Sequence, residues 1–322
     1  MNIVLSPIKL IKIRNELDRF GFSYILAERF QLGKPPISFA SYIHGWIWQK
    51  DFKLVDVGHS FTPLNTPIIV ATKLQKAVLE QYNFKNVIAG GLPFAYVGKS
   101  KVVKKFNSLL IMPPHSMKYL GYNGIDINLL NYVESIRYEF SEICFCLHID
   151  DADDNEITNS LLSKGFIYIV GAHHGDKNSL KRMREIFDYF DYVTTTTMGS
   201  HILYAAFCGC KVSILQEYFL ITPEHAFDQY SWRADFVEYK NSSLDGLNNK
   251  LKLNEQFPWL FLKHPKEAVQ KVDWAIKEIG ADNLLDKGQL MELLGWTARS
   301  KMRALMRTAM RHFSDLCRKS RL

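Results

Sequence analysis

The chain has 322 residues, 47% of them hydrophobic and 13% aromatic, which is enough to bury a large core and favours two domains. No apolar run is as long as a membrane span and no signal-peptide pattern is found, so we expect a cytoplasmic protein. The net charge of +7 comes from the region between Arg299 and Leu322, where eight Lys or Arg residues stand against one Asp, and the rest of the chain is neutral. Five cysteines, four of them in pairs two residues apart, fit buried free thiols better than a metal site.

The first hundred residues mix helix and strand signals, and we expect residues 1–104 to form a small N-terminal α/β domain. Apolar residues that recur with helical spacing alternate there with short apolar runs. The predicted elements are a helix over 8–30, a strand leading into 41–46, a strand over 67–71, a helix ending near 82 and a strand over 86–91.

The segment Tyr42-Ile43-His44-Gly45-Trp46 places a histidine beside a glycine and near two tryptophans. Aromatic side chains present flat apolar surfaces that suit sugar rings, and a histidine that titrates near neutral pH can take a proton from a hydroxyl group. His44 is therefore the candidate catalytic base. A core strand with a hydrogen-bonded histidine explains the same residues, and the sequence leaves both interpretations open.

From Ser108 onward the pattern becomes regular. Short apolar runs alternate with segments of helical spacing, which is typical of βαβ units around a parallel sheet. The expected strands cover 108–112, 143–147, 166–170, 190–194 and 211–215, and the expected helices cover about 126–140, 155–163, 178–188 and 199–208. We expect residues 105–290 to form a second, Rossmann-like α/β domain that binds a nucleotide.

Ligands of parallel sheets bind beyond the carboxyl ends of the strands. His115 and Ser116, after two prolines, are candidates there for binding a phosphate or a sugar hydroxyl, and His173 is another. Adjacent His173 and His174 point in different directions in most backbones, so we do not expect zinc. The segments that follow the predicted strands are Pro113-Pro114-His115-Ser116, His148-Ile149-Asp150-Asp151, Gly171-Ala172-His173-His174-Gly175-Asp176 and 194–200.

Carboxylates gather between Asp150 and Asp154, just after one of these strands. Carboxylate oxygens are the ligands that Mg²⁺ and Mn²⁺ prefer, so a divalent cation could bind there with a nucleotide diphosphate. The same residues precede a predicted helix, where acidic side chains cap free N–H groups and interact favourably with the helix dipole. We prefer the capping role and expect no metal.

A strand that ends in four threonines is followed by Gly199, Ser200 and a helix. The N–H groups at such a helix start suit a phosphate, glycine allows close approach, and the hydroxyls can bind phosphate oxygens or cap the helix. The spacing matches neither the Walker A loop nor GxGxxG, which argues against an ATPase or a dinucleotide dehydrogenase. An ordinary strand-to-helix turn with a Ser/Thr cap remains the alternative.

Residues 291–322 predict a basic amphipathic helix. Its basic stripe contains Arg299, Arg303, Arg307 and Arg311, and its apolar stripe contains Met302, Leu305, Met306, Met310, Phe313 and Leu316. Such a helix fits the surface of an anionic membrane, to which each basic residue contributes on the order of 1 kcal/mol. Packing of the methionines on the body is one alternative. Nucleic-acid binding is another, but no recognition motif accompanies the charge and we expect no nucleic acid.

The two α/β halves, the histidine–tryptophan segment, the phosphate-suited helix start and the basic tail together resemble the GT-B class of glycosyltransferases. The resemblance is to bacterial enzymes that build lipopolysaccharide, capsule or other surface polysaccharides. Its most specific part is FDYVTTTTMGSHILYAAFCGCKVSI (190–214), which is similar to the segment where a strand, a Gly-Ser turn and a helix meet the donor nucleotide.

The resemblance implies a role for each candidate residue. Donor phosphate would contact Thr196, Thr197, Gly199 and Ser200, with His115, Ser116 and His173 at the donor cleft. The N-terminal domain, residues 1–104, would hold the acceptor, with His44 as its base. Enzymes that use CMP-activated acidic sugars often carry a His-Pro pair before a Ser/Thr pair, but here His264-Pro265 follows the threonines. The donor class therefore stays open.

We thus expect metal-independent transfer of a sugar from a nucleotide-sugar donor to a glycan or lipid-linked glycan. The enzyme would act at the inner face of the cell membrane and need no cofactor beyond the donor. A sugar-nucleotide epimerase or hydrolase of the same fold, a metal-dependent transferase that uses Asp150–Asp154, and a non-catalytic scaffold that binds membrane or nucleic acid are the alternatives.

Overall fold

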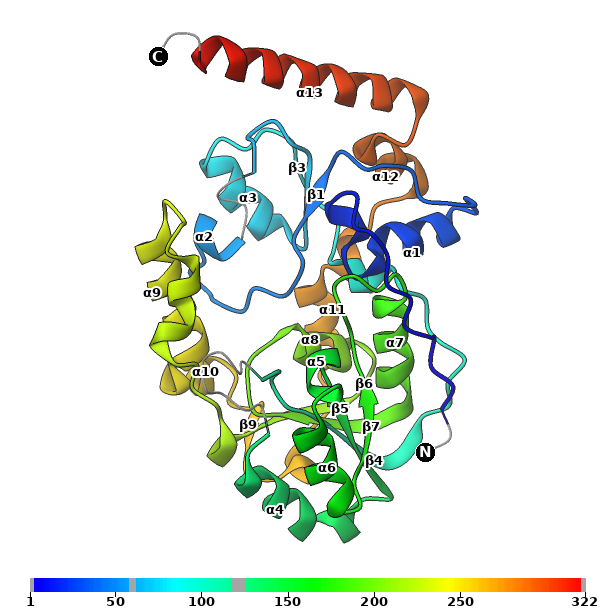
Figure 1. Cartoon of the computed structure of the whole chain (residues 1–322), viewed down its shortest axis with the longest axis vertical. Helices are drawn as coiled ribbons and strands as arrows, with labels where there is room; N and C mark the ends of the chain where they lie inside the picture. Colours follow the sequence, from blue (N-terminus) through cyan, green and yellow to red (C-terminus); the bar gives the residue numbers. More distant parts are fainter. Residues whose placement is uncertain (1–2, 58–61, 117–124, 320–322) are drawn as a thin grey trace.

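The computed structural model describes residues 3–57, 62–116 and 125–319, with side chains described up to residue 309. The protein is an α/β structure built on two parallel sheets. Figure 1 shows the smaller sheet and its helices stacked on the larger sheet along the long axis, with α13 across the far end of the smaller one.

The larger sheet has six strands in the order β6-β5-β4-β7-β8-β9, and all neighbours are parallel. In this doubly wound order the winding reverses between β4 and β7, which is where such sheets bind ligands. The strands are β4 (Lys105–Met112), β5 (Glu142–Leu147), β6 (Ile167–Val170), β7 (Phe190–Thr195), β8 (Lys211–Leu215) and β9 (Phe261–Leu262). All five expected strands are confirmed, whereas β9, with two residues, is too short to leave a periodic signal.

Helices cover both faces of this sheet because the strand side chains alternate between two apolar cores. Leu109 and Ile111 of β4 pack in the core of α4 and α6, and Leu110 packs in the core of α7 and α8. The helices are α4 (Ile127–Ser135), α5 (Ile149–Ala152), α6 (Asn155–Ser163), α7 (Ser179–Tyr189) and α8 (Ser200–Phe207), which confirms the four expected positions. Cys144, Cys146 and Cys210 are buried free thiols, as expected.

The smaller sheet has three parallel strands in the order β1-β2-β3. Its strands are β1 (Ser41–Tyr42), β2 (Ile68–Val70) and β3 (Val87–Ala89), and its helices are α1 (Phe22–Arg29), α2 (Leu54–Val57) and α3 (Lys73–Gln81). The strands expected in the first hundred residues are therefore present, although shorter than their apolar runs.

The helix expected from Ile8 to Phe30 is wrong in its first half. Residues 8–15 run without helical structure along α7 and the loop before it, a short 3₁₀ helix follows at Glu16–Gly21, and α1 begins only at Phe22. The N–H of Ser6 donates to Glu185 Oε2 at 2.6 Å, and the N–H of Lys9 donates to Asp176 Oδ1 at 2.8 Å. Because these acceptors from distant residues satisfy the backbone, the segment does not need helical hydrogen bonds.

The last third of the chain leaves the larger sheet and returns to the smaller one. Its helices are α9 (Phe236–Asn248), α10 (Lys250–Gln256), α11 (Val272–Ile279), α12 (Lys287–Leu294) and α13 (Ala298–Lys319). At Gly280, φ is +73° and a Cβ would lie 2.0 Å from the carbonyl oxygen of Ala71, so only glycine fits this approach to β2. The residues that come back to the smaller sheet, α11 and Gly280, lie inside the range 105–290 expected to form the second domain.

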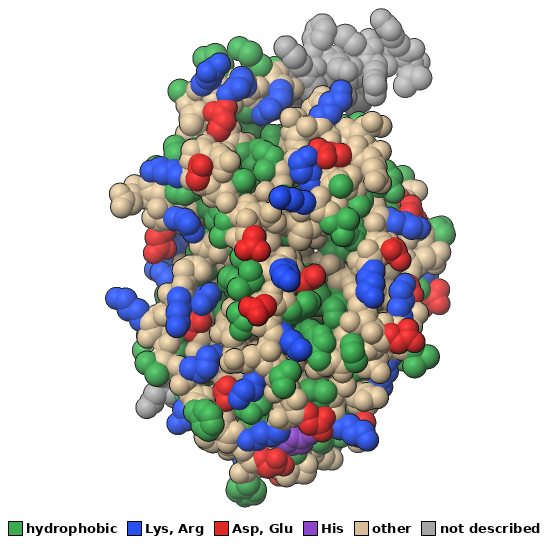
Figure 2. All heavy atoms as spheres, turned by 180° about the vertical axis from the view of Figure 1, so that it is seen from behind, with side chains coloured by type: hydrophobic (Ala, Val, Ile, Leu, Met, Phe, Trp, Pro, Cys, Tyr) green, Lys and Arg blue, Asp and Glu red, His purple; other side chains and the backbone are tan. Residues whose placement is uncertain are grey.

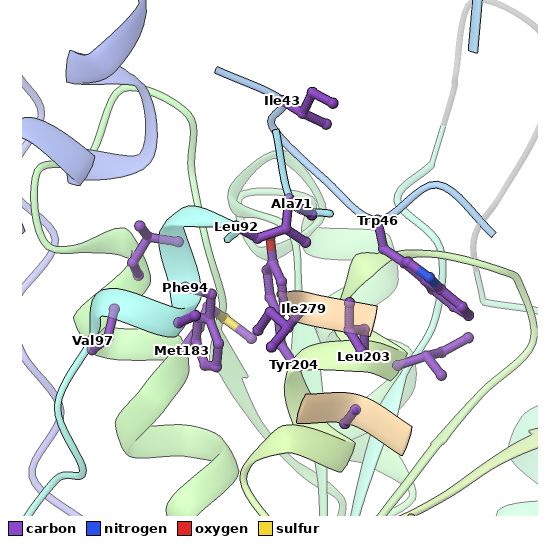
Figure 3. Packing of buried hydrophobic residues seen from close by; sticks show 14 of the residues in the cluster. Ile43, Trp46, Ala71, Leu92, Phe94, Val97, Met183, Leu203, Tyr204 and Ile279 are labelled. Atoms are coloured by element: carbon purple, nitrogen blue, oxygen red, sulfur yellow. The ribbon is translucent and has the colours of Figure 1, made fainter. Parts of the chain in front are cut away.

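One hydrophobic cluster crosses between the two sheets. Figure 3 shows Ala71 and Leu92, which follow strands β2 and β3 of the smaller sheet, beside Tyr204 of α8. The ring of Phe94 stacks on Tyr204 with centroids 4.4 Å apart and planes 8° apart. Apolar packing therefore sets how the two parts of the molecule face one another.

Candidate functional site

A cavity of about 620 Å³ lies where the carboxyl ends of β4, β5, β6 and β7 meet the segment that follows β1. Four of the residues predicted from the sequence line this cavity together, and they come from both sheets. They are His44, His115, Thr197 and Ser200. A site of this size suits a small organic ligand such as a nucleotide.

On the side of the cavity that the segment after β1 forms, His44 pairs with Glu16, a residue that the sequence analysis did not single out. Its Nε2 lies 3.0 Å from Glu16 Oε2, and Arg19 Nε lies 3.3 Å from the same oxygen. The hydrogen bond with His44 lowers the pKa of the Glu16 carboxyl, with Arg19 adding to the effect, so this group is a carboxylate at neutral pH.

The pairing with Glu16 sets the chemistry of the His44 ring. A carboxylate can only accept, so the proton of the neutral imidazole lies on Nε2 and Nδ1 keeps its lone pair. The arrangement resembles that of a general base oriented by a carboxylate. The spacing of 28 residues between the two side chains left no signal in the sequence.

The 44–46 segment is hydrogen-bonded directly to α8. The hydroxyl of Ser200 accepts from the Trp46 N–H at 2.9 Å, and the Tyr204 hydroxyl donates to the His44 carbonyl oxygen at 3.3 Å. A Cβ at Gly45 would lie only 2.4 Å from Ser200 Oγ, so glycine permits this contact. Ser200 lines the cavity, but its hydroxyl already holds the two sides together.

The other residues of the predicted phosphate turn differ in their placement. Thr197, Met198 and His201 line the cavity. Thr196 is instead buried, and its carbonyl oxygen accepts from the Leu220 N–H at 2.8 Å. Gly199 is the N-cap of α8 and offers no side-chain cap, and Ser200 and His201 of the first helical turn line the cavity.

His201, in the first turn of α8, is a further residue that the sequence did not single out. Burial lowers the pKa of His201 to about 4, so its ring is neutral at physiological pH. Its Nε2 is buried and has no hydrogen-bond partner among the described residues. A Cβ at Gly199 would lie 2.7 Å from the ring, so Gly199 also makes room for this imidazole.

Histidines follow three adjacent strands at the far side of the cavity. The ring centroids of His115 and His148 are 5.4 Å apart, and those of His148 and His173 are 6.1 Å apart. His115 and His148 line the cavity, as does Ala172 beside His173. Ser116 lies at the edge of this group, where its N–H donates to Asp151 Oδ1 at 3.1 Å.

Two of the acidic residues between β5 and α6, Asp151 and Asp154, accept hydrogen bonds from backbone N–H groups. Asp154 is the N-cap of α6 and accepts from the Glu156 N–H at 2.8 Å, as the capping interpretation predicts. Among the described side chains, no group of three or more His, Cys, Asp or Glu is arranged to hold a metal ion. His264 caps a short 3₁₀ helix by accepting from the Lys266 N–H, and it does not line the cavity.

Of the two tryptophans expected to stack on a sugar, Trp46 is buried and Trp48 is half-buried. Trp46 is buried against Phe257 and Trp274, with ring centroids 5.5 and 5.3 Å apart, and its Nε1 donates to Glu278 at 3.0 Å. The Nε1 of Trp48 donates to the Gly246 carbonyl oxygen at 2.7 Å. Neither lines the cavity, so these rings position the 44–46 segment instead.

The helix α13 rests on the body through small residues and presents apolar ones outward. Ser300 and Ala304 are buried, whereas Met302, Leu305 and Met306 are 60%, 50% and 53% exposed. The alternative in which the methionines pack on the body is therefore wrong for Met302 and Met306.

The basic stripe of α13 lies beside this apolar face. The described side chains Arg299, Arg303 and Arg307 are exposed, and Arg303 pairs with Glu292. Arg303 and Arg307 also line a hollow of about 300 Å³ against the edge of the smaller sheet, and the side chain of Arg311 lies outside the described residues.

Charge on the rest of the surface is mixed. On the face shown in Figure 2, basic and acidic side chains are interspersed over most of the body, in line with its neutral composition. Within the part of the chain that the structure describes, no helix has both the length and the hydropathy to cross a bilayer.

The fold and the site together define an α/β protein with a ligand-sized cavity at the switch point of a doubly wound parallel sheet. Comparison with family models and with curated proteins finds no match to this sequence. The function must therefore be inferred from the geometry of the cavity.

Proposed function

We propose that the protein is a glycosyltransferase of the GT-B type that moves a sugar from a nucleotide-sugar donor to a membrane-associated glycan. The observation that carries this proposal is a single cavity with two kinds of wall. One wall holds His44, which pairs with Glu16 behind it, and the other holds the strand ends and the start of α8. A base and an anion-binding wall that face one cavity are what sugar transfer from a phosphate leaving group requires.

The proposed reaction needs three events in this cavity. His44 Nδ1 takes the proton of an acceptor hydroxyl, and the oxygen forms a bond to the anomeric carbon of the donor sugar. The bond from that carbon to the phosphate oxygen breaks, and its electron pair leaves with the phosphate. The helix start of α8 and the nearby N–H donors stabilise the charge that develops there, so positioning and fixed dipoles supply most of the catalysis.

We propose that α13 brings this site to an anionic membrane at the inner face of the cell membrane. Support comes from the outward apolar face of Met302, Leu305 and Met306, flanked by Lys301 and Arg299. A helix with apolar residues on one face and cations at its borders binds lipid by burying the apolar face among the headgroups. An acceptor carried by a lipid would then diffuse to the cavity in two dimensions.

Thermal-shift measurements with UDP, GDP, dTDP and CMP test the donor site. A nucleotide that binds the folded protein raises the Tm, and at a hundred times its Kd it contributes about 2.7 kcal/mol to the free energy of unfolding. We expect one of the four to raise the Tm in EDTA. Thr197→Phe, which fills the cavity, should abolish the shift, and Thr308→Phe on exposed α13 should leave it unchanged.

Two results would count against the proposal. If none of the four nucleotides raises the Tm, the cavity does not bind a nucleotide-sugar donor, and a scaffold function is favoured. If a nucleotide binds but the protein converts free nucleotide sugar without an acceptor, an epimerase or hydrolase is favoured.

A further inference from the structure

Three imidazoles stand side by side at the carboxyl ends of three adjacent strands. His115 follows β4, His148 follows β5 and His173 follows β6, and these strands are neighbours in the sheet. The successive ring centroids are 5.4 and 6.1 Å apart, and His174 lies 4.4 Å beyond His173. We call His115, His148 and His173 the histidine row.

Backbone hydrogen bonds set the tautomers in the row. The N–H of Gly175 donates to His173 Nδ1 at 3.1 Å, and the N–H of Asp150 donates to His148 Nδ1 at 3.4 Å. In both neutral rings the proton therefore lies on Nε2, which is then a donor. An anion between these rings could accept a hydrogen bond from each without either histidine being charged.

Charged neighbours make His148 sensitive to an added anion. Burial lowers the pKa of His148, and His115 and His173 lower it further, whereas Asp150 and Asp151 raise it. The ring is therefore mostly neutral near pH 7. If it gains a proton, Nδ1 becomes a donor and Asp150 Oδ2, 3.3 Å away, is in place to accept it.

We propose that the histidine row binds the phosphate groups of the donor, and that His148 at its centre takes up a proton when they bind. This inference rests on the proposed function, and it assigns the phosphate to the β4–β6 side of the cavity as well as to the start of α8. His148 lines the cavity between its two neighbours, so a phosphate that enters reaches it directly. An imidazolium that gains a phosphate and an Asp150 partner is stabilised by two charge-assisted hydrogen bonds.

Isothermal titration calorimetry near pH 7 tests this proposal. The full-length protein is titrated, in PIPES and in Tris, with whichever of UDP, GDP, dTDP and CMP raises its Tm. Proton uptake by the protein takes a proton from the buffer, and ionisation of Tris absorbs more heat than ionisation of PIPES. We therefore expect the wild-type protein to bind less exothermically in Tris at equal affinity.

The variant His148→Asn isolates the residue, because an Asn side chain can still accept from the Asp150 N–H and cap α5. We expect it to bind about tenfold or more weakly, since a hydrogen bond to a charged group is lost, and to lose the heat difference between the buffers. A proton gained or lost by the nucleotide itself would remain in this variant. His225→Asn, exposed and outside the cavity lining, is the matched control and should change neither quantity.

The possible outcomes distinguish failure of the histidine-row inference from failure of the proposed glycosyltransferase function. If His148→Asn keeps both the affinity and the buffer dependence of the wild type, the inference is wrong while nucleotide binding stands. If no nucleotide binds the wild-type protein, the proposed function fails together with it. If His148→Asn does not fold, the exposed His115→Asn replaces it, and wild-type affinity and buffer dependence in that variant likewise contradict a phosphate-binding row.

Discussion

At the scale of single residues, a contact at Gly45 and Ser200 connects one wall of the cavity to the other. Ser200 Oγ accepts the Trp46 N–H, and the absence of a side chain at Gly45 leaves room for that hydroxyl. The catalytic candidate His44 immediately precedes Gly45 in the chain. Small changes at Gly45 should therefore affect both stability and the position of the base.

Gly45→Ala and Ser200→Ala should show strong coupling. The Cβ of Gly45→Ala would lie 2.4 Å from Ser200 Oγ, and overpacking of this kind costs about 1–3 kcal/mol. Ser200→Ala removes an acceptor and should cost about 1–2 kcal/mol. In the double variant the clash is gone, because Ser200 Cβ lies 3.7 Å from the new Cβ, so its stability should match that of Ser200→Ala alone. Urea titration measures the free energy of unfolding of the wild type, the two single variants and the double variant. Strictly additive losses of stability would contradict this contact.

His44→Ala should lower kcat by a factor of about 10²–10⁴, because it removes the proposed base, and should leave the affinity for the donor nucleotide unchanged. Glu16→Gln keeps an acceptor for His44 Nε2 but removes the charge, so we expect a smaller loss of kcat. Initial rates at varied donor concentration give kcat, and a separate binding titration gives the affinity for the nucleotide. Glu80→Gln on exposed α3 is the control. Equal rates for His44→Ala and the wild type would remove His44 from the mechanism.

At the scale of secondary-structure elements, α13 is distinctive because its apolar residues face away from the protein. Its small residues Ser300 and Ala304 form the buried contact, which explains how the helix can lie close to the body without covering Met302 or Leu305. An apolar face on an otherwise basic helix is typical of a segment that lies in the membrane interface.

Replacing Met302, Leu305 and Met306 together by Ser should weaken binding to vesicles that contain phosphatidylglycerol by at least about tenfold, because burial of each side chain contributes about 1.5–3 kcal/mol. Flotation measures the bound fraction. Ala309→Ser, an exposed change on the same helix, is the control. If the vesicle-bound fraction of the triple variant equals that of the wild type, the apolar face does not bind lipid. Light scattering would then test whether this face joins two copies of the chain.

At the scale of the whole molecule, both sheets share one hydrophobic cluster, and a buried ion pair supports the smaller part. The Asp18 side chain is fully buried and accepts from Arg14 Nε at 2.8 Å and from the Ser23 hydroxyl at 2.6 Å. Burial alone would raise the pKa of the Asp18 carboxyl, but the hydrogen bonds from Arg14 and Ser23 outweigh it and lower this pKa below its usual value.

This lowered pKa of Asp18 predicts loss of stability in acid. A carboxyl whose pKa is lower in the folded state stabilises it at every pH above the unfolded value of about 3.9, and this contribution disappears as the pH falls through the folded value. We expect the free energy of unfolding, measured by urea titration, to fall from pH 5 toward pH 3. Asp18→Asn should be less stable at neutral pH and lose less over that range, and an unchanged pH dependence would contradict this account.

Much of the larger sheet was predictable because its signal is local. Each strand from β4 to β8 is a short apolar run between helical segments, and its period follows from burial on two faces. The segment from Ile8 could not be judged in this way. Its apolar spacing is helical, but backbone hydrogen bonds to Glu185 and Asp176 keep the chain before Glu16 out of a helix.

The site was partly predictable for a related reason. His115, Thr197 and Ser200 follow strands, and the carboxyl ends of parallel strands meet at one edge of the sheet whatever the details of packing. Thr196 and Trp46 were misjudged because burial depends on what packs over a residue. Glu16 and His148 acquire their roles from contacts that the sequence does not display.

The amino-acid sequence by itself determined the parallel sheet, the placement of polar residues at its carboxyl edge and the basic character of the last helix, because periodicity, chain order and charge are properties of neighbouring residues. Only the tertiary structure decided that Glu16 meets His44, that Ser200 bonds to Trp46 and that the methionines of α13 face outward. These outcomes depend on distances between atoms far apart in the chain, and such distances are set by the packing of the whole protein.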